Sequence, residues 1–303
     1  MQPLYAGLQV WRNQEDSLRK GVFVKARTLA LSVLALLALA GCSVVEKEFP
    51  PTWRSHFRPK VGDGKGVILL SFDDRNFAGW TAALPIFDKY RAHATFFVYG
   101  PIDKSAISTM QLFCAKGHSV GLHGLRHRNA DKAVEDMGEE MYWKDEIEPQ
   151  LNICRMLNIP VSSFAYPNCR RTDATDALFF SKGFKYVRGS TGLAPHDPKG
   201  LKQAGRRPLS TCDGAFIPSS AIVSNRLLRT TILGANYHTD TNDLVRCIER
   251  AHERDEALVI TSHDISEKPS GIGMPISWLE LILSKSEELG MAVVGYDELP
   301  DPL

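Results

Sequence analysis

Short apolar runs alternate with amphipathic stretches along most of this chain. Residues 67–72 form a six-residue apolar run behind three glycines, a pattern that predicts a buried strand. Further strands are expected at residues 94–99, 119–123, 162–166, 186–188, 257–262 and 292–296. Helices are expected at residues 80–90, 105–116, 131–157, 172–182, 239–254 and 275–289, with Pro149 kinking or dividing the third. Residues 189–237 show no clear pattern.

Regular alternation of strands and helices without an internal repeat indicates an α/β fold with a largely parallel sheet. With 303 residues and 44% apolar composition, the chain can bury one sizeable core, and a barrel of this size is commonly a single domain. The polar candidates for function all follow expected strands, at the ends where α/β barrels carry their active sites.

Two neighbouring carboxylates, Asp73 and Asp74, end the first strand, His123 ends the third, and His127 follows four residues later. Adjacent carboxylates repel each other when enclosed, and a bound cation is the simplest compensation. Imidazole and carboxylate together suit zinc or a similar divalent metal. Either motif alone has a simpler interpretation, because aspartates also cap helices and paired histidines also occur in cores or on surfaces. Together they indicate a metal-dependent hydrolase.

Four short motifs occur in a fixed order: Ser71-Phe-Asp-Asp-Arg75, His123-Gly-Leu-Arg-His127, Phe164-Ala-Tyr-Pro-Asn168 and Thr261-Ser-His-Asp264. In this order they resemble the polysaccharide deacetylase family, the NodB-homology enzymes of carbohydrate esterase family 4. The resemblance covers about residues 65–299. It implies a distorted, NodB-like (β/α) barrel and removal of acetyl groups from a glycan.

The resemblance also assigns roles to single residues. Asp74, His123 and His127 match the metal ligands of the family, with Zn²⁺ the expected ion. Asp73 matches the general base and His263 the general acid. Tyr166 and Asn168 fall in the region that contacts the substrate and the oxyanion.

Two positions depart from the family pattern. Arg75 stands where the family has glycine, and Ala165 stands where it has an arginine that holds the base aspartate. Arginines that could substitute for the missing one are Arg170, Arg171, Arg188 and Arg207. The tryptophan-containing fourth motif is not recognisable between residues 189 and 240.

The amino-terminal segment has the pattern of an export signal. Five basic residues precede an apolar stretch at residues 29–40, which is too short to span a bilayer and fits the core of a signal peptide. Leu39-Ala40-Gly41-Cys42 resembles the lipobox of bacterial lipoproteins, in which the cysteine is lipidated. An ordinary export signal or a short membrane anchor are the alternatives. We therefore expect a signal peptide at residues 1–41, a tether at 42–64 and the NodB-like domain at 65–303, held at the membrane of the cell envelope by Cys42.

Net charge and cysteine spacing restrict the kinds of partner and metal site that are expected. A formal charge of +1 and the lack of a basic stripe argue against nucleic acid. Five cysteines follow Cys42 without a Cys-x-x-Cys pair, so a thiolate zinc site is not expected. The expected substrate is an envelope or extracellular polysaccharide that contains N-acetylglucosamine. An O-acetyl esterase, another amide or imide hydrolase, and a catalytically weak glycan-binding lipoprotein are the alternatives.

Overall fold

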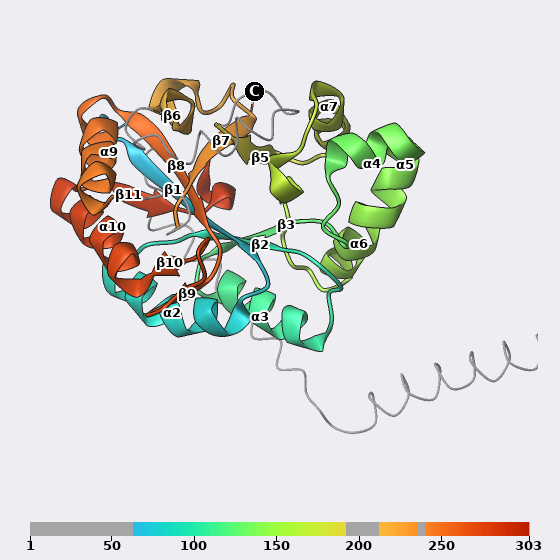
Figure 1. The fold of residues 1–303 in the computed structure, drawn as a ribbon, viewed down its shortest axis with the longest axis horizontal. Helices are drawn as coiled ribbons and strands as arrows, with labels where there is room; N and C mark the ends of the chain where they lie inside the picture. Colours follow the sequence, from blue (N-terminus) through green and yellow to red (C-terminus); the bar gives the residue numbers. More distant parts are fainter. Residues whose placement is uncertain (1–62, 192–211, 235–239, 303) are drawn as a thin grey trace, which may run out of the picture. The chain divides into compact units, whose positions relative to one another are not determined.

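A closed barrel of parallel strands forms the centre of the protein (Figure 1). The computed structural model describes residues 63–191, 212–234 and 240–302. Seven strands close the barrel in spatial order: β1 (Val67–Asp74), β2 (Thr95–Val98), β3 (Ser119–Leu122), β4 (Ser163–Ala165), β5 (Tyr186–Ser190), β7 (Leu227–Ile232) and β8 (Glu256–Ser262), which pairs again with β1. The predicted (β/α) barrel is confirmed.

The barrel is distorted because two of its strands have two neighbours on one edge. Strand β1 pairs with β11 (Ala292–Val294) at its start and with β2 at its end. Strand β8 likewise pairs with the antiparallel β6 (Phe216–Pro218) at its start and with β7 at its end. A small parallel pair, β9 (Ile265–Ser266) and β10 (Met274–Pro275), follows β8.

Helices pack on the outside of the barrel (Figure 1). They are α2 (Phe77–Tyr90), α3 (Lys104–Ala115), α4 (Ala130–Met137), α5 (Glu139–Tyr142), the π-helical turn η2 (Trp143–Ile147), α6 (Glu148–Met156), α7 (Asp173–Ser181), α9 (Thr241–Glu253) and α10 (Ile276–Leu289). Short 3₁₀ turns are η3 (Pro167–Cys169), η5 (Asp213–Ala215), η6 (Ser219–Ala221) and η8 (Tyr296–Glu298). Within the described residues, no helix has the length and apolar content needed to cross a bilayer.

Alternation along β1 decides which residues enter the barrel. Ile68, Leu70 and Phe72 face outward and join the core between strands and helices, where Phe96 stacks on Phe113 with ring centroids 4.1 Å apart. Val67 and Leu69 face the interior, in a second apolar cluster with Phe97 and Tyr296. By the same period, Ser71 and Asp73 also face the interior. Asp73 therefore lies at the end of the apolar core inside the barrel.

Most of the expected elements are present within a few residues of their expected bounds. The predicted division near Pro149 is also observed, since helix α6 starts one residue before this proline. The expectation of irregular structure at residues 189–237 is wrong for one essential strand, β7. Arg229, Thr230 and Thr231 interrupt its apolar pattern, and its position is fixed by pairing with β5 and β8. The predicted signal peptide, most of the tether and Cys42 lie outside the described residues.

Candidate active site

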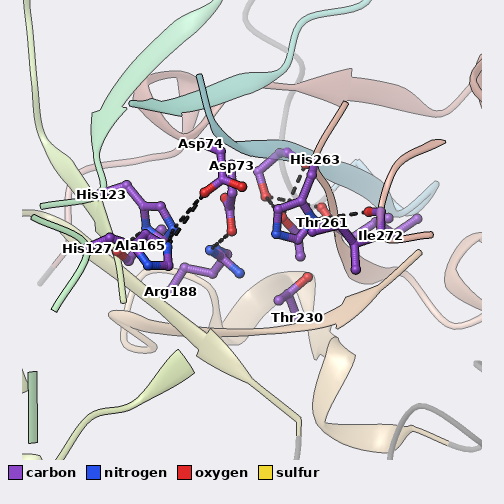
Figure 2. Close-up of polar contacts among 12 residues, drawn as sticks. Asp73, Asp74, His123, His127, Ala165, Arg188, Thr230, Thr261, His263 and Ile272 are labelled. Atoms are coloured by element: carbon purple, nitrogen blue, oxygen red, sulfur yellow. Dashed lines mark hydrogen bonds and ion pairs between the residues drawn. The ribbon is translucent and has the colours of Figure 1, made fainter. Parts of the chain in front are cut away.

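Polar side chains at the ends of three strands meet at the carboxyl end of the barrel (Figure 2). Asp73 and Asp74 end β1, His123 directly follows β3, and His263 directly follows β8. His127 lies in the loop after β3, with a left-handed φ of 56°. The structure thus brings together the sequence-predicted acids and histidines, which are up to 190 positions apart in the sequence.

Asp74, His123 and His127 form a compact group of potential metal ligands. Their nearest ligand atoms all lie within 4.8 Å of one another. The two histidine Nε2 atoms are 3.1 Å apart, and Asp74 Oδ1 lies 3.8 Å from His123 Nε2 and 3.6 Å from His127 Nε2. Among the described residues, no other group of three such side chains converges in this way.

This donor set fits a divalent metal ion. Zinc–nitrogen and zinc–oxygen bonds of about 2.0–2.2 Å place tetrahedral ligand atoms roughly 3.3 Å apart, close to the distances observed here. His123 Nδ1 donates to the carbonyl oxygen of Ala165 at 2.7 Å, which directs the lone pair of Nε2 into the group. Burial lowers the pKa of His123 to about 4, so its imidazole is neutral at pH 7, as a metal ligand must be.

The neighbouring aspartates lie in different environments. Strand alternation turns Asp73 into the barrel, where it is 4% exposed and pairs with the buried guanidinium of Arg188 through Oδ2. Its other oxygen, Oδ1, is buried and accepts no hydrogen bond from the residues that the structure describes. Asp74 has a φ of 84°, which ends the strand geometry, and its carboxylate lies beside the two histidines.

These environments shift the two acid pKa values in opposite directions. Burial disfavours the Asp73 carboxylate, but Arg188, followed by His123 and His263, outweighs it and holds the pKa of Asp73 below its usual range. Burial, together with the adjacent charge of Asp73, raises the pKa of Asp74. A raised pKa means that this carboxylate gains from a nearby cation.

Arg188 supplies the guanidinium that position 165 lacks. Ala165 on β4 and Arg188 on β5 are direct register partners and both face the barrel interior. The small side chain of Ala165 leaves this layer of the barrel to the longer arginine. Of the four candidates raised by the sequence, Arg188 contacts Asp73, whereas Arg170 and Arg171 pair with Asp131 and Asp176, and Arg207 lies outside the described residues.

His263 is held from two sides. Its Nδ1 lies 3.1 Å from the carbonyl oxygen of Ile272 and donates to it, which leaves Nε2 available toward the site. Its backbone carbonyl accepts a hydrogen bond of 2.7 Å from the indole of Trp80. Figure 2 shows the His263 ring on one side of Asp73 and the rings of His123 and His127 on the other.

The two residues expected to contact the substrate, Tyr166 and Asn168, do not lie with the carboxylates and histidines of the site. The structure does not bring Tyr166 to the site, because its ring packs against Phe164 and Phe179 in the outer core and its N–H bonds to Arg188. Asn168 is exposed beyond β4, with a left-handed φ of 52°, and its side chain donates to Asn129. Strand alternation at 163–166 could have indicated that Tyr166 faces outward, since Ala165 faces inward.

Arg75 occupies the place of the family's glycine without entering the metal-ligand group. Its guanidinium donates to the carbonyl oxygens of Tyr99 and Pro101 and pairs with Asp103 at 2.8 Å. It therefore ties the loop after β2 to the end of β1, and this departure leaves the carboxylate cluster intact.

The buried pair predicts a pH-dependent loss of stability on Arg188→Met. Without Arg188, the Asp73 charge has no counter-charge, which costs about 3–5 kcal/mol of unfolding free energy at pH 7. In the wild type, the lowered pKa of Asp73 stabilises the fold above the unfolded value of about 3.9, and this is lost as pH falls through the folded pKa. In the variant the pKa of Asp73 rises, so the cost of burying its charge disappears as the carboxyl group is protonated toward pH 4.

Denaturant titrations measure the difference in unfolding free energy between wild type and Arg188→Met, which should narrow between pH 7 and pH 4. The double variant Asp73→Asn/Arg188→Met should recover part of the loss, and a gap independent of pH would contradict the assignment.

Comparisons with known proteins give one family match, one related sequence and several structural alignments. Residues 60–187 match the polysaccharide deacetylase family, a stretch that includes Asp73, Asp74, His123 and His127. YheN of Bacillus subtilis (strain 168), whose name assigns it provisionally to the polysaccharide deacetylases, is 28% identical over 85 residues. That match spans 28% of this chain and 30% of YheN. A carbohydrate esterase family 4 enzyme from Streptococcus mutans aligns with a TM-score of 0.49 at 18% identity, over 78% of this chain and 88% of that one.

The polysaccharide deacetylase Bc1974 from Bacillus cereus aligns with a TM-score of 0.46 at 18% identity, over 77% of this chain and 92% of that one. The family match thus covers the part of the chain that carries Asp73, Asp74, His123 and His127, and is a similarity over residues 60–187.

Proposed function

We propose that this protein is a metal-dependent hydrolase that removes acetyl groups from an N-acetylated polysaccharide. The observation that supports the proposal most strongly is that two adjacent carboxylates, Asp73 and Asp74, lie in different environments. Asp74 lies with two histidines in a metal-ligand arrangement, while Asp73 is held ionised by Arg188 with one buried oxygen free to accept a proton. Structural aspartates at a strand end have no need of such different environments.

The ligand group would be Asp74, His123 and His127, with zinc the preferred ion for this donor set. Such an ion supplies Lewis-acid polarisation of the acetyl carbonyl and lowers the pKa of water in the site. Among the residues that the structure describes, these three leave the remaining coordination open, as catalytic rather than structural sites do.

Asp73 would act as the general base. Its lowered pKa keeps it ionised at neutral pH, and the unpartnered Oδ1 can accept a proton from the attacking water. The bond from Arg188 to Oδ2 fixes the carboxylate in one orientation. Because Arg188 also stabilises the ionised form, Asp73 gains a defined position and loses some basicity.

His263 would act as the general acid. Its Nδ1–H is committed to the Ile272 carbonyl, so the proton delivered to the departing amine would come from Nε2. An amine leaves an acetyl group much more readily when it is protonated, whereas a good leaving group departs without this help. This difference separates amide from activated-ester hydrolysis in the tests below.

The substrate would be an envelope or extracellular glycan that contains N-acetylglucosamine. Acetate release from a panel of N-acetylated glycans and O-acetylated xylan, with metal-reconstituted protein, decides between an N-deacetylase and an O-acetyl esterase. The weak glycan-binding alternative loses support because Arg188 supplies the group that Ala165 lacks.

Metal binding by Asp74, His123 and His127 gives the first test of this proposal. Purified protein should contain about one divalent ion per chain, and His127→Ala should reduce both occupancy and affinity because one ligand is lost. Inductively coupled plasma analysis and zinc titration measure both quantities. His252→Ala, which changes a histidine on the distant helix α9, is the control. Equal metal content in wild type and His127→Ala would show that the ligand set is wrong.

Asp73 and His263 should be needed for turnover but not for metal retention. Asp73→Asn removes the base and His263→Ala removes the acid, and each should lower N-deacetylation by about 10²–10⁴-fold with metal content unchanged. The His263→Ala defect should shrink on an aryl acetate, whose leaving group departs without protonation. Rates equal to wild type on both substrates would mean that His263 is not the acid, and the glycan-binding alternative would regain support.

We further propose that the protein is exported and held at the membrane of the bacterial envelope by lipid attached to Cys42. The support is the sequence alone, namely the apolar stretch at residues 29–40 followed by Leu39-Ala40-Gly41-Cys42. The mature protein would begin at Cys42, with residues 42–64 as tether.

Loss of the anchor cysteine should release the protein. Cys42→Ala should move the chain from the membrane to the soluble fraction, because acyl chains and not a spanning helix would provide the attachment. Fractionation followed by immunoblotting measures the distribution, with Cys114→Ala as the control. If Cys42→Ala stays with the membrane, the apolar stretch itself is the anchor.

A further inference from the structure

A buried glutamate lies beneath the loop that carries His127. Glu146 belongs to the π-helical turn η2 and its carboxylate is fully buried. This turn is joined to Pro149, which has no N–H to donate to the carbonyl of Asp145 four residues earlier. The carbonyl of Asp145 accepts a hydrogen bond from the guanidinium of Arg126 at 2.6 Å. The irregular turn thus directs its polar groups toward the loop after β3 (α5 and α6 in Figure 1).

Glu146 accepts hydrogen bonds from three backbone N–H groups of this loop. Its carbonyl oxygen accepts from Leu125 at 2.9 Å. Its carboxylate Oε1 accepts from Arg126 at 2.7 Å and from Arg128 at 3.1 Å. The two amides bonded to one oxygen therefore lie on either side of His127 in the sequence.

The backbone at His127 explains this arrangement. His127 has a left-handed φ of 56°, which a residue with a Cβ seldom adopts. A left-handed residue turns the N–H groups on either side of it toward one point, and this concavity binds an anion. Here the anion is the carboxylate of Glu146. Removing it would leave both N–H groups without a partner and the left-handed conformation without support.

Burying the Glu146 carboxylate removes it from water, and this cost must be offset by hydrogen bonds or nearby cations. Its Oε2 accepts no hydrogen bond from the described residues, and the nearest cations are Arg126 at 3.6 Å and Arg128 at 4.0 Å. A Cβ at Gly124, which has a φ of +83°, would lie 3.1 Å from Oε1, so glycine allows the close approach. A group that fits this tightly under one loop fixes the shape of that loop.

We propose that Glu146 is a positioning residue that sets the metal-binding geometry of His127. The proposal rests on the metal site of the proposed function, because what Glu146 positions is one of its ligands. Beyond that function, we infer that the position of His127 depends on a carboxylate that is not itself a ligand. This carboxylate belongs to a turn that lies 20 residues after Arg126 in the sequence.

The test compares Co²⁺ affinity and loop protection in the full chain and its Glu146 variants. Glu146→Ala should lower the affinity for Co²⁺, measured by spectroscopic titration of metal-free protein, by about 10–100-fold. Glu146→Gln, whose amide oxygen can still accept both N–H bonds, should stay close to wild type. Hydrogen exchange of peptides covering residues 124–128 should become faster in Glu146→Ala and not in Glu146→Gln.

A matched control separates positioning from general loss of stability. Leu151→Ala creates a cavity in the same helical region, but the buried Leu151 side chain is apolar and cannot hydrogen-bond to the loop, so Co²⁺ affinity should be retained. If Glu146→Ala does not fold, Glu146→Asp serves instead, because its carboxylate is one methylene too short to reach both amides. It should bind Co²⁺ more weakly than Glu146→Gln.

The outcomes identify which proposal fails. If wild type binds Co²⁺ and Glu146→Ala binds it equally well, the positioning role is overturned and the metal site stands. An equal loss in Leu151→Ala would also overturn the role, since general destabilisation would explain both. A wild-type protein that binds no Co²⁺ would overturn the metal site, and with it this role.

Discussion

The ion pair between Asp73 and Arg188 inside the barrel is the constraint on which the site depends. Two buried charges are costly unless their geometry is good and their partners are fixed. Both side chains face the interior of the barrel. Their backbone positions are fixed because β1 and β5 are paired with neighbouring strands on both sides. The pair therefore gives Asp73 a single orientation before any substrate arrives. The charge of Arg188 holds the pKa of Asp73 low, whereas burial and the negative charge of Asp73 raise the pKa of the neighbouring Asp74.

Where Arg188 lies in the sheet shows what a barrel requires of its sequence. The guanidinium must reach Asp73 from an inward-facing position in the right layer, but the strand that provides it can change. Ala165 and Arg188 are register partners on adjacent strands, and it is the arginine on β5 that contacts Asp73. Motif matching along a sequence treats this as a loss, because the motif is defined by position in the chain. In the folded barrel, the relevant variables are layer and facing direction.

Much of the fold and site could be predicted because local pattern and tertiary environment agree there. Apolar runs such as 67–72 form buried strands, and polar residues at their ends converge at one rim because the strands are parallel. Strand β7 could not be predicted with the same rules, since Arg229 and two threonines hide its alternation and its neighbours supply the pairing. The position of the Tyr166 ring could not be predicted from the motif for a different reason. Its motif position favoured the site, but the strand period turns its ring into the outer core.

Glu146 had no motif that could have identified it, and the reason is physical. Its proposed role depends on a backbone conformation, the left-handed φ at His127, and on an irregular turn before Pro149 whose Asp145 carbonyl accepts from Arg126. The sequence did contain two separate signs, a glycine after His123 and a proline shortly after Glu146, but only the fold places them against each other. A ligand histidine in a loop needs an external support, since a loop has no helical or sheet ladder to fix it. In this protein the support is a buried carboxylate, which is why the site extends beyond the residues that would contact the metal ion.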